Sequence, residues 1–154
     1  MMSETQIRSV ALFFFCSIME ESVATSAIHK SLRRIEKELQ KKDQIRPTHA
    51  VIVFWTDRIW RRYNKKVKYV TLGLDQMFRL PKDVDLDSWK QLQKEILPEE
   101  FLAAIWTGLL GYTANEVAEG LGVSQGMVQH RTGIALKRLG QIVTSGKLNA
   151  KKRA

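Results

Sequence analysis

Residues able to read DNA bases cluster at the start of one helical segment near the C-terminus. The stretch 125–131 reads QGMVQHR, so glutamine, histidine and arginine side chains recur within about two helical turns. Glutamine and arginine can each form two hydrogen bonds with a base edge, whereas histidine can donate one to a base or a phosphate. Backbone N–H groups near Ser124 would also favour a phosphate, because a helix N-terminus carries partial positive charge. The residues predicted to contact DNA are Thr113, Ser124, Gln125, Gly126, Met127, Gln129, His130, Arg131, Lys137 and Arg138.

Residue patterns that support catalysis or metal binding are missing from the sequence. His29, His49 and His130 are scattered, and none has a cysteine or carboxylate at the spacing of a metal site. No phosphate-binding loop, dinucleotide fingerprint or nucleophile elbow is present. Glu99 and Glu100 open a predicted helix, where the helix dipole favours acids without any catalytic role. We therefore expect no enzyme activity, no catalytic residue, no metal and no cofactor.

Two short predicted helices position the candidate DNA-reading residues. Thr113 can cap the first helix, with Glu116 completing a capping box, and Gly122 can end it in a left-handed conformation. Ser124 can cap the second helix, which we expect over residues 125–139. Two helices joined by a glycine-containing turn form the helix-turn-helix pattern, whose second helix enters the DNA major groove. The alternative is an ordinary helical hairpin with a polar outer face. The expected buried faces are Val117, Ala118 and Leu121 on the first helix, and Val128, Ile134 or Ala135, Leu136 and Leu139 on the second.

The segment 97–142 resembles region 4 of bacterial RNA polymerase sigma factors, especially in the extracytoplasmic-function group. Region 4 is the module that reads the −35 promoter element. The matching motifs are LPEEF at 97–101, GYTANEVA at 111–118 and LGVSQGMV at 121–128, followed by a basic end at 137–139. This resemblance implies an all-α fold and promoter contacts by the second helix. The departures are one residue missing before Gly111, Leu102 and Gly108 in place of arginine, Met127 in place of threonine and Gln129 in place of lysine.

A second family has a similar pattern in this segment. Residues 137–140 read KRLG and resemble the end of the helix-turn-helix of LuxR-type response regulators. The LPEEF opening at 97–101 and Gly126 favour the sigma-factor interpretation over this alternative.

The N-terminal part predicts three more helices. After a frayed start at residues 1–6, apolar residues recur at helical spacing over 7–19, 22–42 and 48–65. The third helix has a basic stripe beside aromatic residues, which suits contact with single-stranded nucleic acid or with the nucleic-acid backbone, through charge and base stacking. The alternative is that the tryptophans are core residues and the arginines are solvated. The residues predicted to contact DNA or polymerase are Arg58, Trp60, Arg61, Arg62 and Lys65.

These three helices faintly resemble sigma region 2, the module that binds the polymerase clamp and opens the −10 element. Residues 50–66 (AVIVFWTDRIWRRYNKK) resemble the end of that module. The family has an acidic stretch on the second helix that meets polymerase, but residues 22–29 of this chain hold no carboxylate. We therefore expect a region 2-like module at 1–66, a linker at 67–87, a region 4-like module at 88–146 and a basic tail at 147–154.

Composition is consistent with a soluble nucleic-acid-binding protein. The 154 residues carry a net charge of +9 and are 44% hydrophobic, which permits a core and favours a polyanionic partner. A merely basic soluble protein is the alternative. Cys16 is the single cysteine, so no internal disulfide can form, and a reducing compartment fits. The longest apolar runs, 10–15 and 50–55, are too short to span a membrane, and no targeting signal is evident. We expect a cytoplasmic, nucleoid-associated protein.

These observations predict a DNA-binding transcription regulator that resembles a divergent extracytoplasmic-function sigma factor. Its expected partners are double-stranded DNA, core RNA polymerase and an anti-sigma protein, with no membrane. One alternative is a sigma-like helix-turn-helix regulator, monomeric or dimeric, that has lost sigma activity. Another is an interaction module that binds polymerase or an anti-sigma partner.

Overall fold

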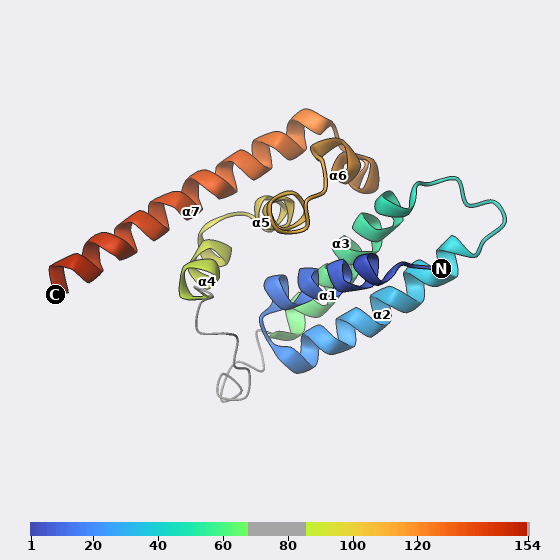
Figure 1. The fold of residues 1–154 in the computed structure, drawn as a ribbon, viewed down its shortest axis with the longest axis horizontal. Helices are drawn as coiled ribbons and strands as arrows, with labels where there is room; N and C mark the ends of the chain where they lie inside the picture. The colour runs from blue at the N-terminus through green and yellow to red at the C-terminus, as the bar shows by residue number, and fades with distance from the viewer. Residues whose placement is uncertain (68–85, 154) are drawn as a thin grey trace.

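The described part of the chain is entirely helical. The computed structural model describes residues 1–67 and 86–153, with the side chains of 1–64 and 87–146. Within these ranges the chain forms α-helices and one π-helical turn, and no strand (Figure 1). This confirms the predicted all-α class. Most of the expected linker, including residues 68–85, lies outside the described residues. The elements are α1 (Glu4–Ile18), α2 (Glu21–Leu39), α3 (Thr48–Val67), α4 (Leu86–Glu95), α5 (Pro98–Ala104), η1 (Ile105–Leu109), α6 (Ala114–Leu121) and α7 (Gln125–Arg153).

Local capping fixes where the first two helices begin. The Ser3 hydroxyl accepts the Gln6 backbone N–H at 3.2 Å, and the Gln6 side chain accepts the Ser3 N–H at 2.9 Å. This capping box starts α1 at Glu4, and the side chain of Met2 is buried. The expectation of a frayed start over residues 1–6 was therefore wrong. The Glu20 carboxylate caps α2 by accepting N–H groups two and three residues later.

The C-terminal helices follow the predicted signals at their start but not at their end. Pro98 occupies the first turn of α5, and the Glu100 side chain accepts the Leu97 N–H at 2.9 Å. The chain then passes through the π-helical turn η1 and turns at Gly111, where φ is +75°. Helix α7 continues to Arg153, well beyond the expected end at residue 139, and its backbone includes most of the expected tail. In Figure 1 its C-terminal part extends away from the other helices.

The N-terminal and C-terminal helices share one apolar core. We call α1–α3 the N-terminal half and α4–α7 the C-terminal half. Among the described residues, buried apolar side chains of both halves form one continuous cluster. Phe13 of α1 stacks on Trp106 of η1, with ring centroids 5.3 Å apart and planes 16° apart. The Trp89 indole of α4 donates to the Cys16 carbonyl at 2.6 Å, and the Gln93 amide donates to the Ser17 carbonyl at 3.0 Å. Side chains of the C-terminal half therefore satisfy carbonyls at the end of α1.

Candidate DNA-binding surface

The turn between α6 and α7 is built by the predicted capping residues. The Thr113 hydroxyl accepts the Glu116 N–H at 3.1 Å, and the Glu116 carboxylate accepts the Thr113 N–H at 3.0 Å. Gly122 ends α6 with φ +70°, and the Ser124 hydroxyl accepts the Met127 N–H at 3.1 Å. The pKa of Glu116 lies below its ordinary value, mainly because its carboxylate accepts a hydrogen bond from the Thr113 backbone N–H. These contacts fix the direction in which α7 leaves the turn.

The first turns of α7 present their polar side chains to solvent. Val128 and Ala135 are fully buried, as predicted for the inner face. Leu136 is 51% exposed, so its predicted place on the buried face was wrong. The other predicted residues, Ala135 and the partly buried Leu139, do supply that face. Arg131 is half-buried, and the exposed residues at the start of the helix are Ser124, Gln125, Gly126, Met127, Gln129 and His130.

Lys137 and Arg138 of α7 have different surroundings. The Lys137 side chain is exposed to solvent. The Arg138 guanidinium instead contacts the Glu95 carboxylate of α4 at 2.8 Å and the Gln141 side chain at 3.0 Å. The Arg138 hydrogen bond lowers the pKa of Glu95. In this structure Arg138 therefore ties α7 to α4.

The basic stripe predicted on α3 is only partly a surface feature. Trp60 is 3% exposed, and its indole N–H donates to the Ser17 carbonyl at 3.4 Å. The expectation that Trp60 contacts DNA or polymerase is corrected, because it is a core residue. Arg58 and Arg62 are exposed. Arg61 contacts Asp57 at 3.2 Å and Glu99 of α5 at 3.5 Å. The side chain of Lys65 lies outside the described residues.

A cation–π cluster on α2, α3 and the loop between them was not predicted from the sequence. The Arg46 and Arg58 guanidinium groups lie 4.9 and 5.8 Å from the centre of the Phe54 ring. The Arg34 guanidinium lies 5.6 Å from the Trp55 ring. The aromatic residues among the arginines were a sequence signal for stacking, but the spacing does not show which arginine reaches which ring. The cluster adds positive charge to a half-buried aromatic surface.

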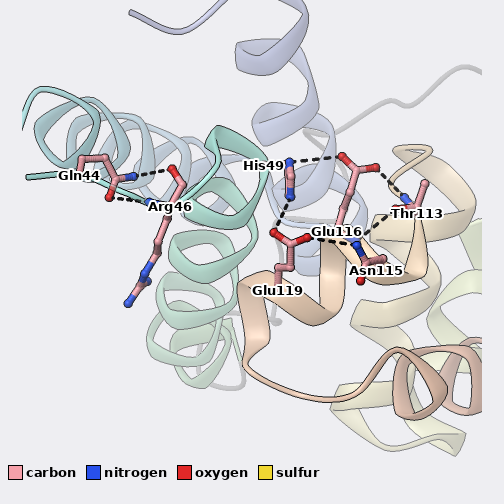
Figure 2. A network of polar contacts seen from close by, with 7 residues as sticks. All are labelled: Gln44, Arg46, His49, Thr113, Asn115, Glu116 and Glu119. Atoms are coloured by element: carbon pink, nitrogen blue, oxygen red, sulfur yellow. Dashed lines mark hydrogen bonds and ion pairs between the residues drawn. The ribbon is translucent and has the colours of Figure 1, made fainter.

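A polar network between α3 and α6 was also missed. Figure 2 shows His49 of α3 between two carboxylates of α6. Its Nδ1 atom lies 3.5 Å from Glu116, and its Nε2 atom lies 3.3 Å from Glu119. The Asn115 amide donates to the other oxygen of Glu119 at 3.1 Å. The sequence held no signal for these contacts, because His49 and Glu119 are 70 positions apart.

Within the parts of the chain that the structure describes, no cluster of three or more histidine, cysteine or acidic side chains could hold a metal ion. In the described ranges no helix has the length and apolar character needed to cross a membrane.

Comparison with known proteins gives a match at the level of fold. Neither a model of a protein family nor the sequence of a curated protein matches this chain. The structure is similar to the sigma factor RpoE, in its complex with the anti-sigma factor NepR from Bartonella quintana. The TM-score is 0.67 at 17% sequence identity, and the match covers 90% of this chain and 92% of that chain. The match therefore includes helices of both halves. The chain has the all-α fold of this sigma factor, in agreement with the resemblance in its sequence.

Proposed function

We propose that this chain is a DNA-binding transcription regulator that directs or modulates initiation by RNA polymerase, as a divergent extracytoplasmic-function sigma factor would. The observation that carries the proposal is the exposed polar start of α7, which follows a capped α6 in a chain with a sigma-factor fold. The net charge of +9 supports a polyanionic partner. In this proposal the chain has no catalytic residue, because the polymerase performs the chemistry.

In the proposed mechanism the C-terminal half binds promoter DNA and the N-terminal half binds polymerase. Helix α7 would enter the major groove with Gln125, Gln129 and Arg131 towards base edges. Backbone N–H groups at the start of α7, together with Lys137, would bind phosphates. The N-terminal half, the proposed module at 1–66, would bind core polymerase and use its exposed arginines on DNA. The chain would act in the cytoplasm at the nucleoid.

Duplex binding is the first test of this proposal. The purified full-length chain is titrated with a pool of duplexes at several salt concentrations, and the bound sequences are selected and read. We expect enrichment of a common sequence and a steep loss of affinity with salt, because phosphate contacts release counterions. Arg33→Ala on α2 is the matched control for Arg131→Ala, since it removes the same charge from an exposed helix position. Equal effects of the two substitutions would count against base reading by α7.

Polymerase binding is the second test. The chain is mixed with core RNA polymerase, scored for co-elution, and then assayed for transcripts from a pool of genomic promoters. Co-elution with new, promoter-specific transcripts is the result expected of a sigma factor. Absence of co-elution would contradict the polymerase part of the proposal and leave a free-standing DNA-binding regulator.

One observation favours a second candidate, a protein-interaction module that binds polymerase or an anti-sigma partner. The structural neighbour is a sigma factor in complex with an anti-sigma factor. In this chain Glu20 uses its carboxylate to cap α2, and no acid follows Glu21 through residue 29. An acidic polymerase-binding surface on this helix is therefore reduced. Co-elution with polymerase without transcripts, and without sequence-selective duplex binding, would favour this candidate. Sequence-selective duplex binding without co-elution would instead favour a regulator that has lost sigma activity.

A further inference from the structure

A cavity of about 430 Å³ lies between α1, α3 and the segment that leads into α6, and the start of α6 also contributes to its wall. Its volume falls within the range of about 300–1,000 Å³ that is typical of small-molecule sites. Helices α3 and α6, which both line it, are in close contact, because a Cβ atom on Gly120 would lie only 2.5 Å from the Cβ of Val53. None of the residues proposed to contact DNA or polymerase lines this cavity. The cavity is therefore separate from the candidate DNA-binding surface.

The wall of the cavity carries hydroxyl groups that have no protein partner. Thr5 and Ser9 line the cavity from α1. Thr48 lines it from α3, and Tyr112 lines it from the segment before α6. Within the described part of the chain, no other residue forms a hydrogen bond with any of these four hydroxyl groups. Because a hydroxyl group can donate one hydrogen bond and accept two, the wall offers several donors and acceptors to a bound molecule.

Another part of the wall is apolar. Ile52 is buried, and the side chains of Leu110 and Tyr112 are half-buried. Burial raises the pKa of the Tyr112 hydroxyl, and the nearby Glu116 carboxylate raises it further. This hydroxyl therefore stays protonated at neutral pH and keeps its donor. The cavity thus combines an apolar surface with hydrogen-bonding groups.

The charged groups at the cavity favour a cation. Glu116 is in the wall, and its lowered pKa keeps its carboxylate ionised at neutral pH. His49, also in the wall, lies 3.5 Å from Glu116 and 3.3 Å from Glu119, as Figure 2 shows. Even with a proton on His49, the two carboxylates leave one negative charge uncompensated. Among the described residues no lysine or arginine lines the cavity, so it lacks the side chains that usually hold a phosphate or a carboxylate.

Glu116 can still accept hydrogen bonds from a ligand. Its Oε1 atom accepts the Thr113 N–H at 3.0 Å, and its Oε2 atom lies 3.5 Å from Nδ1 of His49. An ionised carboxylate has about four lone-pair positions, so these contacts leave acceptor positions for an ammonium group. The Glu116 side chain is 32% exposed, so a ligand can reach it from solvent.

From these groups we propose that the cavity binds a small aliphatic ammonium compound, a diamine or a polyamine. One ammonium group contacts the Glu116 carboxylate, where the charges attract it. The methylene chain lies against the apolar part of the wall at Ile52, Leu110 and the Tyr112 ring. The remaining amine forms hydrogen bonds with the hydroxyl groups of the wall. This site belongs to the chain alone, so it does not depend on the proposed DNA or polymerase binding.

Amide chemical shifts of the full-length protein measure this binding directly. The isotope-labelled chain is titrated at constant ionic strength with putrescine, and separately with butanediol of the same chain length, which carries hydroxyl groups in place of the two charges. Putrescine should give saturable shifts of the Gly111 and His49 amide signals, because both residues belong to the cavity wall. Butanediol should give no saturable shift over the same concentrations. The absence of saturation with putrescine, or equal shifts with the two compounds, would overturn the proposal.

Ser9→Leu tests whether the diamine occupies the cavity. The larger apolar side chain takes up space in the cavity and removes one hydroxyl group, so the saturable shifts should be lost. Ser26→Leu makes the same change at an exposed position of α2 outside the wall, and it should keep the affinity of the parent. An affinity like that of the parent in Ser9→Leu would overturn the proposal.

A charge variant tests the contact with the ammonium group without filling the cavity. Glu116→Gln keeps a side chain that can complete the capping box but removes the negative charge. The affinity for putrescine should fall about tenfold, because a hydrogen bond to a charged group is stronger than one to a neutral amide. Glu36→Gln removes the same charge from an exposed position of α2 and should leave the affinity nearly unchanged, since salt screens distant charges. Equal losses in the two variants would contradict the proposed contact. If Ser9→Leu fails to fold, this pair decides.

Discussion

At the scale of single residues, side chains at the start of α7 test whether the proposed DNA-binding surface reads bases or only phosphates. Replacing Gln129 or Arg131 with alanine should reduce discrimination between duplexes by about 1–3 kcal/mol, because each side chain can form a bidentate base contact. Lys137→Ala should weaken binding to all duplexes about equally, because a phosphate contact carries no sequence information. Titration of a selected and a scrambled duplex at one salt concentration separates the two effects. Unchanged discrimination in both variants would rule out the proposed groove contacts.

The capping box of α6 makes one contribution to stability dependent on pH. The pKa of Glu116 is lowered in the folded chain, mainly by the Thr113 N–H. A carboxylate of this kind stabilises the fold above its unfolded pKa, and this contribution is lost as the pH falls through the folded pKa. The ordinary pKa of a glutamate is 4.5. At pH values below this, the free energy of unfolding should therefore depend less on pH in Glu116→Gln than in the parent. Urea unfolding at a series of acidic pH values measures this, and an unchanged slope would contradict the assignment.

At the scale of elements, the start of α7 depends on its cap. Ser124→Ala should lower the free energy of unfolding by about 0.5–2 kcal/mol, because the hydroxyl that accepts the Met127 N–H is lost. Ser124→Gly should cost only a few tenths of a kcal/mol. Urea unfolding of the two variants gives the comparison. A larger loss for glycine than for alanine would show that the cap does not control this helix end.

The sequence predicted where helices begin better than where they end or which other helices they pack against. The sequence predicts a frayed start at Ser3, although this residue caps α1, because the burial of Met2 has no local signal. Helix α7 runs to Arg153, since no residue after Leu139 forces a stop. The sequence predicts that Trp60 contacts DNA or polymerase, but α1 and α3 pack so that its indole reaches the Ser17 carbonyl. Capping is a local interaction, whereas burial depends on which helix lies opposite.

At the scale of the whole molecule, the two halves should unfold as one unit. Trp106 is 1% exposed, stacks on Phe13 of α1 and donates to the Thr56 hydroxyl of α3 at 3.2 Å. Trp106→Ala should cost about 3–5 kcal/mol, because it leaves a large cavity between the halves. The parent should show a single transition in which circular dichroism and hydrogen exchange of both halves change together. Two separated transitions in the parent would contradict a shared core.

The sequence by itself determined the helical class, the capped turn between α6 and α7, and the exposed start of α7. These depend on residues a few positions apart, such as Thr113 with Glu116 and Ser124 with Met127, so spacing reveals them. Tertiary structure alone decided how the halves meet. Gly120 against Val53 joins positions far apart in the chain, and nothing in the local pattern of either helix encodes the other. Long-range packing is selected by the fit of whole surfaces, which becomes visible only once the chain has folded.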